Sequence, residues 1–350
     1  MSAFRPSTTF AAVLDPINDP RWQRFVDTAA GATIFHHSAW LSLIHRRYRY
    51  PVAACTLLDS DESVRAGFPV ALVRTPLRGP RLVAFPFSDL CAPLGSPGEV
   101  GALGPVAGEL RQRMGASMEV RGPFPGAPDA QPGARYCHHV VALAPHVGEV
   151  ERRFRRSSVL RGVRRARREG LVAERRSDVE ALDSFYRLHV ATRSRLGAPT
   201  QPRGFIRDLE QLFAENLGFV LLVARRADIA AAAVFLHHGG VLTYKYGASD
   251  ARALGLRPNN LLFWEAIRWG CENGMDRLYL GRTDVGQESL RTFKLAWGAE
   301  EDELVYTHLG NETPRSADRG VLGRALAVGL RRSPPIASRV AGELLYRHAG

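Results

Sequence analysis

The order of helical and strand-like segments repeats itself in the two halves of this 350-residue chain. In each half, helical patterns precede three apolar runs of strand length, and a polar loop, a helix and a further strand follow. The runs cover 52–58, 64–73 and 81–87 in the first half and 219–225, 229–237 and 241–248 in the second. A stretch rich in proline and glycine, 122–134, separates the halves as a loop beside a domain boundary. The pattern predicts a duplicated, mixed α+β fold in which each copy is a mostly antiparallel sheet flanked by helices.

The length supports two domains of ordinary size, which we place at residues 1–150 and 151–312. Residues 313–350 are predicted to form a helical extension. Its apolar positions are expected to pack against the body of the protein in preference to a membrane surface. These positions are Ile336, Val340, Leu344 and Leu345.

Three features of the composition narrow the class of protein. The longest apolar run, 229–236, is far too short to cross a bilayer, and the first residues lack the pattern of a signal peptide. A cytoplasmic protein is therefore expected. The four cysteines contain no CxxC pair, and the eleven histidines, which lack ligand spacing, are interpreted as surface or strand-end residues. The sequence thus predicts neither a disulfide framework nor a metal site.

Positive charge is concentrated in one segment. The chain has a net charge of +12, and residues 152–168 alone contain nine arginines and no acidic residue. On a helix that begins near Ser158, four arginines share one face: Arg161, Arg164, Arg165 and Arg168. Such a face can bind the phosphates of a polyanion such as tRNA, or of a nucleotide diphosphate. The alternative is a helix face that is simply solvated.

Lysine is rare in this chain, because only Lys245 and Lys294 among its 47 basic residues are lysines. A position that keeps lysine in such a background can mark a need for a compact ammonium group. In the helical pattern 287–297, Lys294 shares a face with three apolar residues: Leu290, Phe293 and Trp297. A partly desolvated ammonium interacts strongly with developing negative charge, as stabilisation of an oxyanion or phosphate requires. The alternative is a lysine whose stem lies along the edge of an apolar face.

Charged residues follow the strand-like run 277–280. Arg282 and Asp284 lie at the carboxyl end of this run, where α/β folds commonly bind ligands. The two side chains could bind substrate, or they could pair with each other as a structural bridge.

A second polar strand end follows the run 241–248. Tyr244, Lys245 and Tyr246 are predicted to alternate along the strand, so that Lys245 faces away from both tyrosines. Tyr246 precedes the flexible segment 247–250 and could shape an acceptor pocket. The alternative is a tyrosine that belongs to the core.

Seven segments together carry a family resemblance. They are FHHSAWL (35–41), FPFSDLCAPLG (85–95), VLRGVRRARREGL (159–171), YKYGASD (244–250), RPNNLLFWEAIRWGCENG (257–274), LYLGRTD (278–284) and LRTFKLAWGAEEDELVY (290–306). On these segments the chain resembles the FemAB-like (FemABX) family of the GNAT acyltransferase superfamily. The resemblance implies two tandem GNAT-like domains and transfer of an acyl group to an amine. The best-known members add an amino acid from aminoacyl-tRNA to a peptidoglycan-precursor peptide.

The resemblance also implies roles for residues. The family's Phe-Lys pair, which matches Phe293 and Lys294, lies at the catalytic cleft, where the lysine stabilises the reacting carbonyl. Asp89 matches a carboxylate of the first domain that is expected to line the substrate groove. The residues and the resemblance together predict Lys294 and Asp284 as catalytic residues. Substrate-binding residues are predicted to be Phe293, Arg282, Tyr246, Asp89, Asn259 and Trp297.

Two departures from the family pattern bear on the donor and the acceptor. GNAT enzymes that use acetyl-CoA usually carry [QR]-x-x-G-x-[GA] before the helix that holds the pyrophosphate, and the matching segment 252–257 ends in Arg257. The arginine at this position weakens the prediction of a CoA-binding site. No extended heptad pattern matches the long helical arm of some peptidoglycan members, so a role in cell-wall cross-bridges does not follow.

We therefore expect an aminoacyltransferase without a permanently bound cofactor. It would bind tRNA and move the aminoacyl group from aminoacyl-tRNA to an amine of a peptide, a cell-wall precursor or a natural product. One alternative is an acyl-CoA-dependent N-acyltransferase that acts on a sugar, a polysaccharide precursor or a small-molecule amine. Another is a non-catalytic module that has the same fold.

Overall fold

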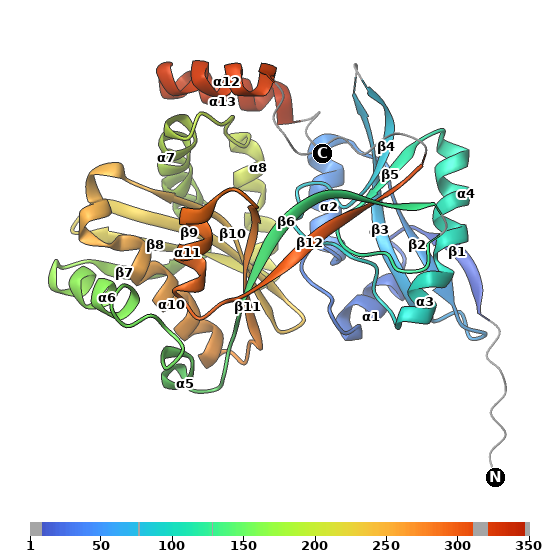
Figure 1. The fold of residues 1–350 in the computed structure, drawn as a ribbon, viewed down its shortest axis with the longest axis horizontal. Coiled ribbons are helices and arrows are strands. Elements are labelled where there is room, and N and C mark those ends of the chain that lie inside the picture. Colours follow the sequence, from blue (N-terminus) through green and yellow to red (C-terminus); the bar gives the residue numbers. More distant parts are fainter. Residues whose placement is uncertain (1–8, 76–77, 128, 311–320, 347–350) are drawn as a thin grey trace, which may run out of the picture. The chain divides into compact units, whose positions relative to one another are not determined.

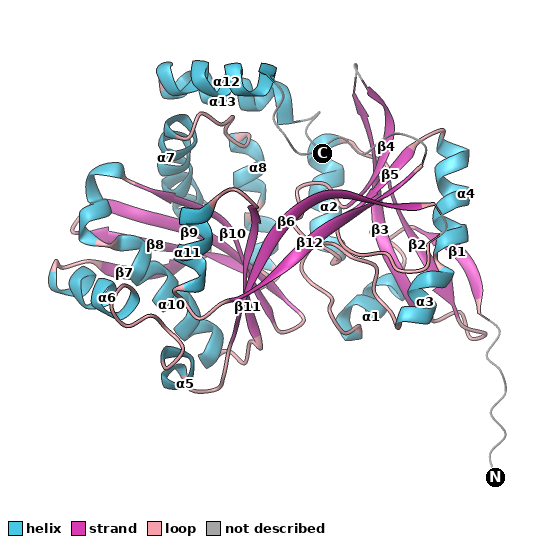
Figure 2. Cartoon of the chain, in the orientation of Figure 1, coloured by secondary structure: helices cyan, strands magenta, loops and turns pink. Residues whose placement is uncertain are grey.

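The computed structural model describes residues 9–75, 78–127, 129–310 and 321–346. They form two compact units, drawn in Figures 1 and 2 as sheets with helices packed on them. Unit 1 contains the described residues up to 135 together with 304–310, and unit 2 contains 136–303 together with 321–346. The predicted mixed α+β class is confirmed. The expected domain limits, 150 and 312, remain a prediction about which segments fold independently.

Unit 1 is formed by the helices and strands of the N-terminal part of the chain, together with the last residues of one strand, β12, from the C-terminal part. Its helices are α1 (Pro20–Thr28), α2 (Ser38–Tyr48), α3 (Pro97–Ala102) and α4 (Gly104–Met114), and its strands are β1 (Phe10–Leu14), β2 (Val52–Leu58), β3 (Val64–Thr75), β4 (Arg78–Ala84) and β5 (Ser117–Val120). The strands pair in this order, all antiparallel except β4 with β5. Strand β12 (Glu300–Leu309) enters from unit 2 and pairs with β5 through its last residues. Phe68, Leu103 and Met118 lie in the buried core of this unit.

Unit 2 has the same general plan with more helices. Its helices are α5 (Val147–Glu151), α6 (Val159–Arg168), α7 (Val179–Arg195), α8 (Arg203–Asp208), α9 (Glu210–Ala214), the 3₁₀ helix η1 (Ala251–Leu256), α10 (Pro258–Glu272), α11 (Glu288–Leu295), α12 (Val321–Arg332) and α13 (Pro335–Leu345). Its strands are β6 (Ala130–Ala142), β7 (Val172–Arg176), β8 (Gly218–Arg225), β9 (Asp228–His238), β10 (Val241–Ser249) and β11 (Arg277–Asp284). They lie in the order β6-β11-β10-β9-β8-β7. Neighbours are antiparallel except β10 and β11, which are parallel because the chain returns through α10.

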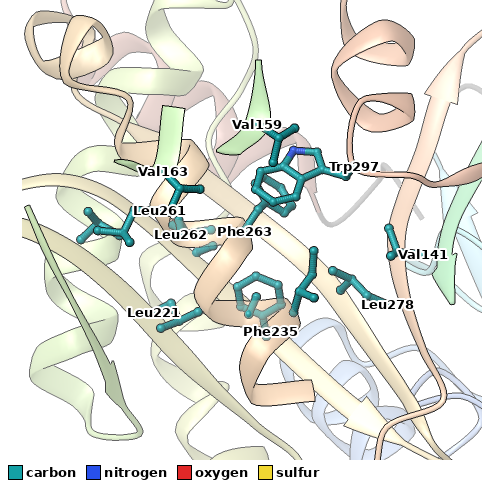
Figure 3. Packing of buried hydrophobic residues seen from close by; sticks show 14 of the residues in the cluster. Val141, Val159, Val163, Leu221, Phe235, Leu261, Leu262, Phe263, Leu278 and Trp297 are labelled. Carbon is teal, nitrogen blue, oxygen red and sulfur yellow. The ribbon is translucent and has the colours of Figure 1, made fainter. Parts of the chain in front are cut away.

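The core of unit 2 lies between one face of its sheet and helices α6 and α10. Figure 3 shows Phe263 of α10 among Phe235 and Leu278 from the strands, Val163 from α6 and Trp297. Pro258 favours the start of α10, because proline has no amide hydrogen and the first helical amides have no partner within the helix. Each large apolar side chain buried in this way stabilises the fold by about 1.5–3 kcal/mol.

The alternation predicted for Tyr244, Lys245 and Tyr246 is wrong, because β10 contains a β-bulge at this point. Tyr244 pairs with Phe235, and Tyr246 pairs with the adjacent residue Val234. One extra residue, Lys245, is therefore inserted in β10. Since adjacent residues of β9 point to opposite faces of the sheet, Tyr244 and Tyr246 also lie on opposite faces.

Strands β1 and β6 are not among the elements expected from the sequence. Strand β6 begins at Ala130, inside the stretch 122–134 that was expected to form only a loop. Pro132 and Gly133 weaken the local preference for strand, but both fall near the start of β6, where a ladder tolerates proline. The partner strand β11 is far away in the sequence, so no local pattern could show this pairing.

Helix α13 packs on α7, but not through the residues expected to do so. Its buried residues are Ser338 and Gly342. The four apolar residues predicted to pack inward are exposed: Ile336 by 59%, Val340 by 50%, Leu344 by 61% and Leu345 by 42%. Small residues let the two helices approach closely, since a Cβ atom on Gly342 would overlap the backbone of Thr200. No helix among the described residues has both the length and the apolar character needed to span a membrane.

Candidate functional site

The sheet of unit 2 opens between β10 and β11. These parallel strands pair over three residues only, Val241–Thr243 against Arg277–Tyr279. Beyond them, β10 continues beside β9 to Ser249, and β11 continues beside β6 to Asp284. The facing backbone edges past this point are not paired with each other, so they can offer hydrogen bonds to a ligand. The opening lies at the carboxyl ends of parallel strands, where α/β folds commonly bind ligands.

Helix α10 begins beside this opening, because it follows β10 after the short η1. The amide groups of its first turn can hold a phosphate. Arg257, the residue before the helix, has a φ of 65°, which glycine adopts most readily. The chain therefore keeps a glycine-like backbone at the position where the sequence departs from the CoA-binding pattern. Asn259 lies in the first turn of α10 and is partly buried.

The bulge in β10 decides which tyrosine can reach the α7 side of the sheet. Tyr244 lies on the core side, with its ring 4.8 Å from the ring of Phe263. Tyr246 lies on the other side, with ring centroids 6.0 Å from His189 and 6.3 Å from Phe205. The ammonium of Lys245 is 5.1 Å from the Tyr246 ring, within range of a cation–π contact.

Lys294 is buried in the wall of the site, on the side of the sheet that α11 covers. Only 5% of the surface of Lys294 is exposed to solvent. The ammonium donates to the Gly281 carbonyl at 2.7 Å and to Thr283 Oγ1 at 2.8 Å. A weaker contact reaches the Arg282 carbonyl at 3.5 Å. These bonds hold a compact positive charge against the last residues of β11, next to the opening. An arginine could not fit this arrangement in the same way, because its donors lie in a wide planar fork.

A second charged network lies beside Lys294 and was not predicted. Arg291 of α11 donates two hydrogen bonds to Glu301 of β12, at 2.7 and 2.9 Å. His139 Nε2 of β6 donates to the same carboxylate at 2.8 Å. The hydrogen bonds from Arg291 are the main reason that the pKa of Glu301 falls to about 2. Burial, with the positive charge of Lys294, lowers the pKa of His139.

His139 is buried, so the interpretation of the histidines as surface or strand-end residues is wrong at this position. Strand β6 was not expected, and without it the sequence contains no signal that His139 and Glu301 meet. The network ties β6, β12 and α11 together around Lys294. It therefore fixes the helix that carries the lysine.

Arg282 and Asp284 lie at the carboxyl end of β11, as the sequence predicted. The guanidinium of Arg282 lies over the ring of Tyr136, 4.4 Å from its centroid. In the backbone register of the two strands, Arg282 of β11 lies opposite His138 of β6. The exposed Asp284 carboxylate accepts a hydrogen bond from Gln287 Nε2 at 3.1 Å, just before α11 begins. Asp284 thus shapes the turn into α11 and presents its carboxylate to solvent.

Phe293 and Trp297, which flank Lys294 in the sequence, pack in the core of unit 2. Trp297 is fully buried, and Phe293 lies 5.5 Å from Phe263 and 6.4 Å from Trp297 by ring centroids. Leu290, which the helical pattern placed on the same face, is exposed. The apolar face around the lysine is therefore narrower than predicted.

Helix α6 presents arginines to solvent near the start of α10. The residues Arg161, Arg164, Arg165 and Arg168 are exposed, while Val159, Val163 and Ala166 are buried. Asn260 Nδ2, in the first turn of α10, donates to the Ser158 carbonyl at 3.3 Å. Arg167 stacks on Trp264 at 4.2 Å and forms an ion pair with Glu265 at 3.4 Å. Helix α6 is thus fixed on α10 with its arginine face outward, as the sequence predicted.

Asp89 lies in unit 1 and is described within that unit alone. Its backbone carbonyl accepts a hydrogen bond from Tyr306 Oη at 2.7 Å. The preceding carbonyl, of Ser88, accepts one from Arg121 at 2.7 Å. These bonds order the segment that carries the Asp89 carboxylate.

A known protein family covers the part of the chain that contains the opening. Residues 153–295 match the family described as an acetyltransferase (GNAT) domain, and they include α6, α10 and Lys294. No curated protein sequence matches the chain.

Solved structures share the fold of almost the whole chain. The crystal structure of FemX superposes with a TM-score of 0.66 at 15% identity, over 84% of this chain and 96% of FemX. The C-terminal domain of a putative lysylphosphatidylglycerol synthetase from Agrobacterium fabrum gives a TM-score of 0.55 at 14% identity, over 89% and 94% of the two chains. A tandem GNAT protein from the clavulanic acid biosynthesis pathway gives 0.51 at 12% identity, over 87% and 100%. Residues 153–295 are therefore similar in sequence to a GNAT acetyltransferase domain, and the chain as a whole has a fold like that of FemX.

Proposed function

We propose that this enzyme transfers an aminoacyl group from aminoacyl-tRNA to an amine acceptor, and that the site lies at the opening between β10 and β11. The observation that carries the proposal is the exposed arginine face of α6, which the hydrogen bond from Asn260 to Ser158 places next to the start of α10. A donor with many phosphates can lie along this face while its reactive end reaches the opening. The fold shared with a putative lysylphosphatidylglycerol synthetase, whose product carries an amino acid, supports the same class of transfer.

A concave surface beside the arginine face adds to the proposal. A pocket of about 440 Å³ is lined by Arg152, Arg156 and Arg164, with Glu151 as its acidic residue. Such a pocket can hold a backbone phosphate between several guanidinium groups, which bind phosphate oxygens in pairs.

In the proposed reaction, the acceptor amine attacks the ester carbonyl that joins the amino acid to tRNA. The amide bond forms, the ester bond breaks, and the tRNA hydroxyl leaves with a proton from the amine. Lys294 stabilises the oxyanion, and Asp284 holds the acceptor amine at the end of β11. Arg282 and Tyr246 contact the substrate from the face of the sheet that lies opposite α11. Because the ester is already activated, positioning and charge stabilisation can supply most of the rate.

A second candidate is transfer from acyl-CoA. The glycine-like backbone of Arg257, just before α10, favours it, because the amide groups in the first turn of a helix can bind a pyrophosphate. The two donors differ in size and charge, so one experiment separates them.

The experiment supplies the purified full chain with either a pool of charged tRNAs or a pool of acyl-CoAs. A small-molecule extract of cells serves as the source of amines. Loss of the aminoacyl ester with gain of a ribonuclease-resistant product supports the tRNA donor, whereas release of free thiol supports acyl-CoA. Leu295→Met, an exposed neighbour on the same helix, is the control for Lys294→Met. Ester loss that persists in Lys294→Met at the normal rate would contradict the assigned site.

A further inference from the structure

The C-terminal helices of unit 2 carry an exposed apolar stripe. Ile336, Val340 and Leu344 recur every four residues of α13, so they share one face, and all three are exposed. Val328 of α12 is exposed as well. Single exposed apolar residues are ordinary, but a continuous stripe of them marks an interaction surface.

The opposite face of α13 fixes the direction of this stripe. Ser338 Oγ donates to the Ala198 carbonyl at 2.6 Å and lies 2.8 Å from Thr200 Oγ1. Gly342 lies against the backbone of Thr200. The helix is thus held on the end of α7 by its small residues, and Figure 1 shows α12 and α13 together over α7. The apolar stripe points away from the protein and cannot rotate inward without breaking these bonds.

Positive charge surrounds the stripe. Residues 321–346 contain four arginines and one glutamate, a net charge of +3. Arg332 and Arg339 are exposed beside the stripe. An apolar face bordered by arginines is the pattern by which helices lie in the interface of an anionic membrane.

A basic pocket adjoins the same stripe. It has a volume of about 440 Å³, and Ile336 and Arg339 line it together with Arg187 and Arg203. Tyr186 also lines it, and among the described residues its buried hydroxyl has no hydrogen-bond partner. The acidic residue of the pocket, Asp183, already pairs with Arg203 at 3.1 Å and with Arg207 at 3.1 Å. The pocket therefore offers donors to a phosphate at the edge of the apolar stripe.

We propose that α12 and α13 dock this enzyme on the surface of an anionic phospholipid membrane. Ile336, Val340 and Leu344 enter the boundary of the acyl chains, and the pocket at Tyr186 and Arg339 receives a lipid phosphate. The proposal does not depend on which acyl donor the enzyme uses.

Two other occupants of the stripe fit the chain less well. The preceding segment, NETPRSADRG at 311–320, contains no large apolar residue that could cover the stripe. A second copy of the chain would bring two sets of arginines against each other, and like charges in contact oppose association. An anionic surface matches both the apolar residues and the charge.

The test is sedimentation of the full chain with vesicles of phosphatidylcholine alone or of phosphatidylcholine with phosphatidylglycerol. Binding is expected with the anionic vesicles only, and it should weaken as salt is raised. Val340→Asp combined with Leu344→Asp should lower the partition coefficient about tenfold or more, since two apolar side chains that enter the membrane are replaced by carboxylates. Arg332→Gln combined with Arg339→Gln should lower it by a similar factor. Inorganic phosphate at millimolar concentration should not release the protein, because free phosphate offers no acyl chains.

Matched controls are Val172→Asp, which changes an apolar residue 69% exposed on β7, and the pair Arg225→Gln and Arg226→Gln, which changes two exposed arginines at the end of β8. Both should bind as the unchanged protein does, and thermal melting checks the fold of every variant. The proposal is overturned if the unchanged protein does not distinguish the two vesicles, or if the control variants lose binding equally. Dimers that form without lipid and are disrupted by the change at Val340 and Leu344 would assign the stripe to a second copy. Release by inorganic phosphate would reduce the site to one for free anions.

Discussion

At the scale of single residues, Lys294 is the side chain on which the proposed chemistry depends most. Replacing it with methionine keeps the apolar stem and removes the ammonium that donates to Gly281 and Thr283. Loss of a positive charge that stabilises an oxyanion is expected to lower kcat by about 10²–10³-fold. Single-turnover kinetics with saturating donor would measure it.

The same substitution has a structural cost that must be separated from catalysis. Two buried acceptors lose their donor, which should lower the free energy of unfolding by about 1–3 kcal/mol. Thr283→Val removes one of these hydrogen bonds while keeping the ammonium, so it should lower stability with a much smaller effect on kcat. A kcat that falls equally in both variants would show that Lys294 acts only by holding β11 and α11 together.

Glu301 gives stability a pH dependence with a defined sign. Its pKa in the folded protein is about 2, against an ordinary value of 4.5. Since the unfolded chain binds the proton more readily, the carboxylate stabilises the fold above pH 4.5, and this contribution is lost as the pH falls toward 2. Glu301→Gln should therefore be less stable than the unchanged protein at pH 6, and the difference should shrink between pH 4.5 and 3.

Urea denaturation across this pH range measures the effect. The matched control is Glu300→Gln, which changes the neighbouring exposed carboxylate and leaves the bonds to Arg291 and His139 intact. A constant difference between Glu301→Gln and the unchanged protein at all pH values would mean that the charge of Glu301 is not what stabilises the network.

At the scale of elements, the arginine face of α6 makes a prediction about salt. Replacing Arg164, Arg165 and Arg168 with glutamine should weaken tRNA binding and make it less dependent on salt. The slope of log K against log salt should decrease by about 0.7–0.9 for each phosphate that the variant no longer neutralises, the range that spans single strands and B-form DNA. Filter binding at several salt concentrations measures the slope.

The control for this prediction is the pair Arg225→Gln and Arg226→Gln, which changes the exposed last residue of β8 and the exposed residue that follows it in the turn to β9. It removes positive charge from the same unit without touching α6. Equal weakening by both sets would show that net charge alone, and not the α6 face, attracts tRNA.

Elements with a local signal were predictable, and those defined by distant partners were not. Strand β2 follows from a short apolar run, and helix α6 follows from helical periodicity, because both patterns lie within a few residues and record which side chains are buried. Strand β6 depends on β11, about 140 residues away in the sequence, and its own start is rich in proline and glycine. The bulge at Lys245 is equally hidden, since an inserted residue changes the facing of its neighbours without changing their types.

The candidate site shows the same division. Lys294 stood out by its rarity, and Arg282 and Asp284 by their place after a strand. The partners of Lys294 could not be predicted, because Gly281 contributes a backbone carbonyl and His139 arrives on a strand that the sequence did not reveal. A sequence pattern can identify a reactive group, but the bonds that orient it depend on tertiary pairing.

At the scale of the whole molecule, the path of the chain decides which residues form each unit, and the repeated order of helices and strands does not. Unit 1 contains residues from both parts of the chain, because the last residues of β12 pair with β5. Tyr306 donates to the Asp89 carbonyl, and Leu309 belongs to the core of unit 1. The domain limit proposed at residue 150 would leave all of these interactions out of the first fragment.

A fragment of residues 1–150 is therefore expected not to fold by itself. It would expose the edge of β5 and the apolar residues that Leu309 covers, and a sheet with an open apolar edge tends to aggregate. Residues 1–142 joined by a glycine-serine linker to 300–310 should instead give a cooperative urea transition and dispersed amide signals in NMR spectra, because both strands that cross between the units are restored. If 1–150 unfolds cooperatively at the same urea concentration as the joined fragment, β12 adds nothing to unit 1, and the limit at residue 150 describes an independent domain.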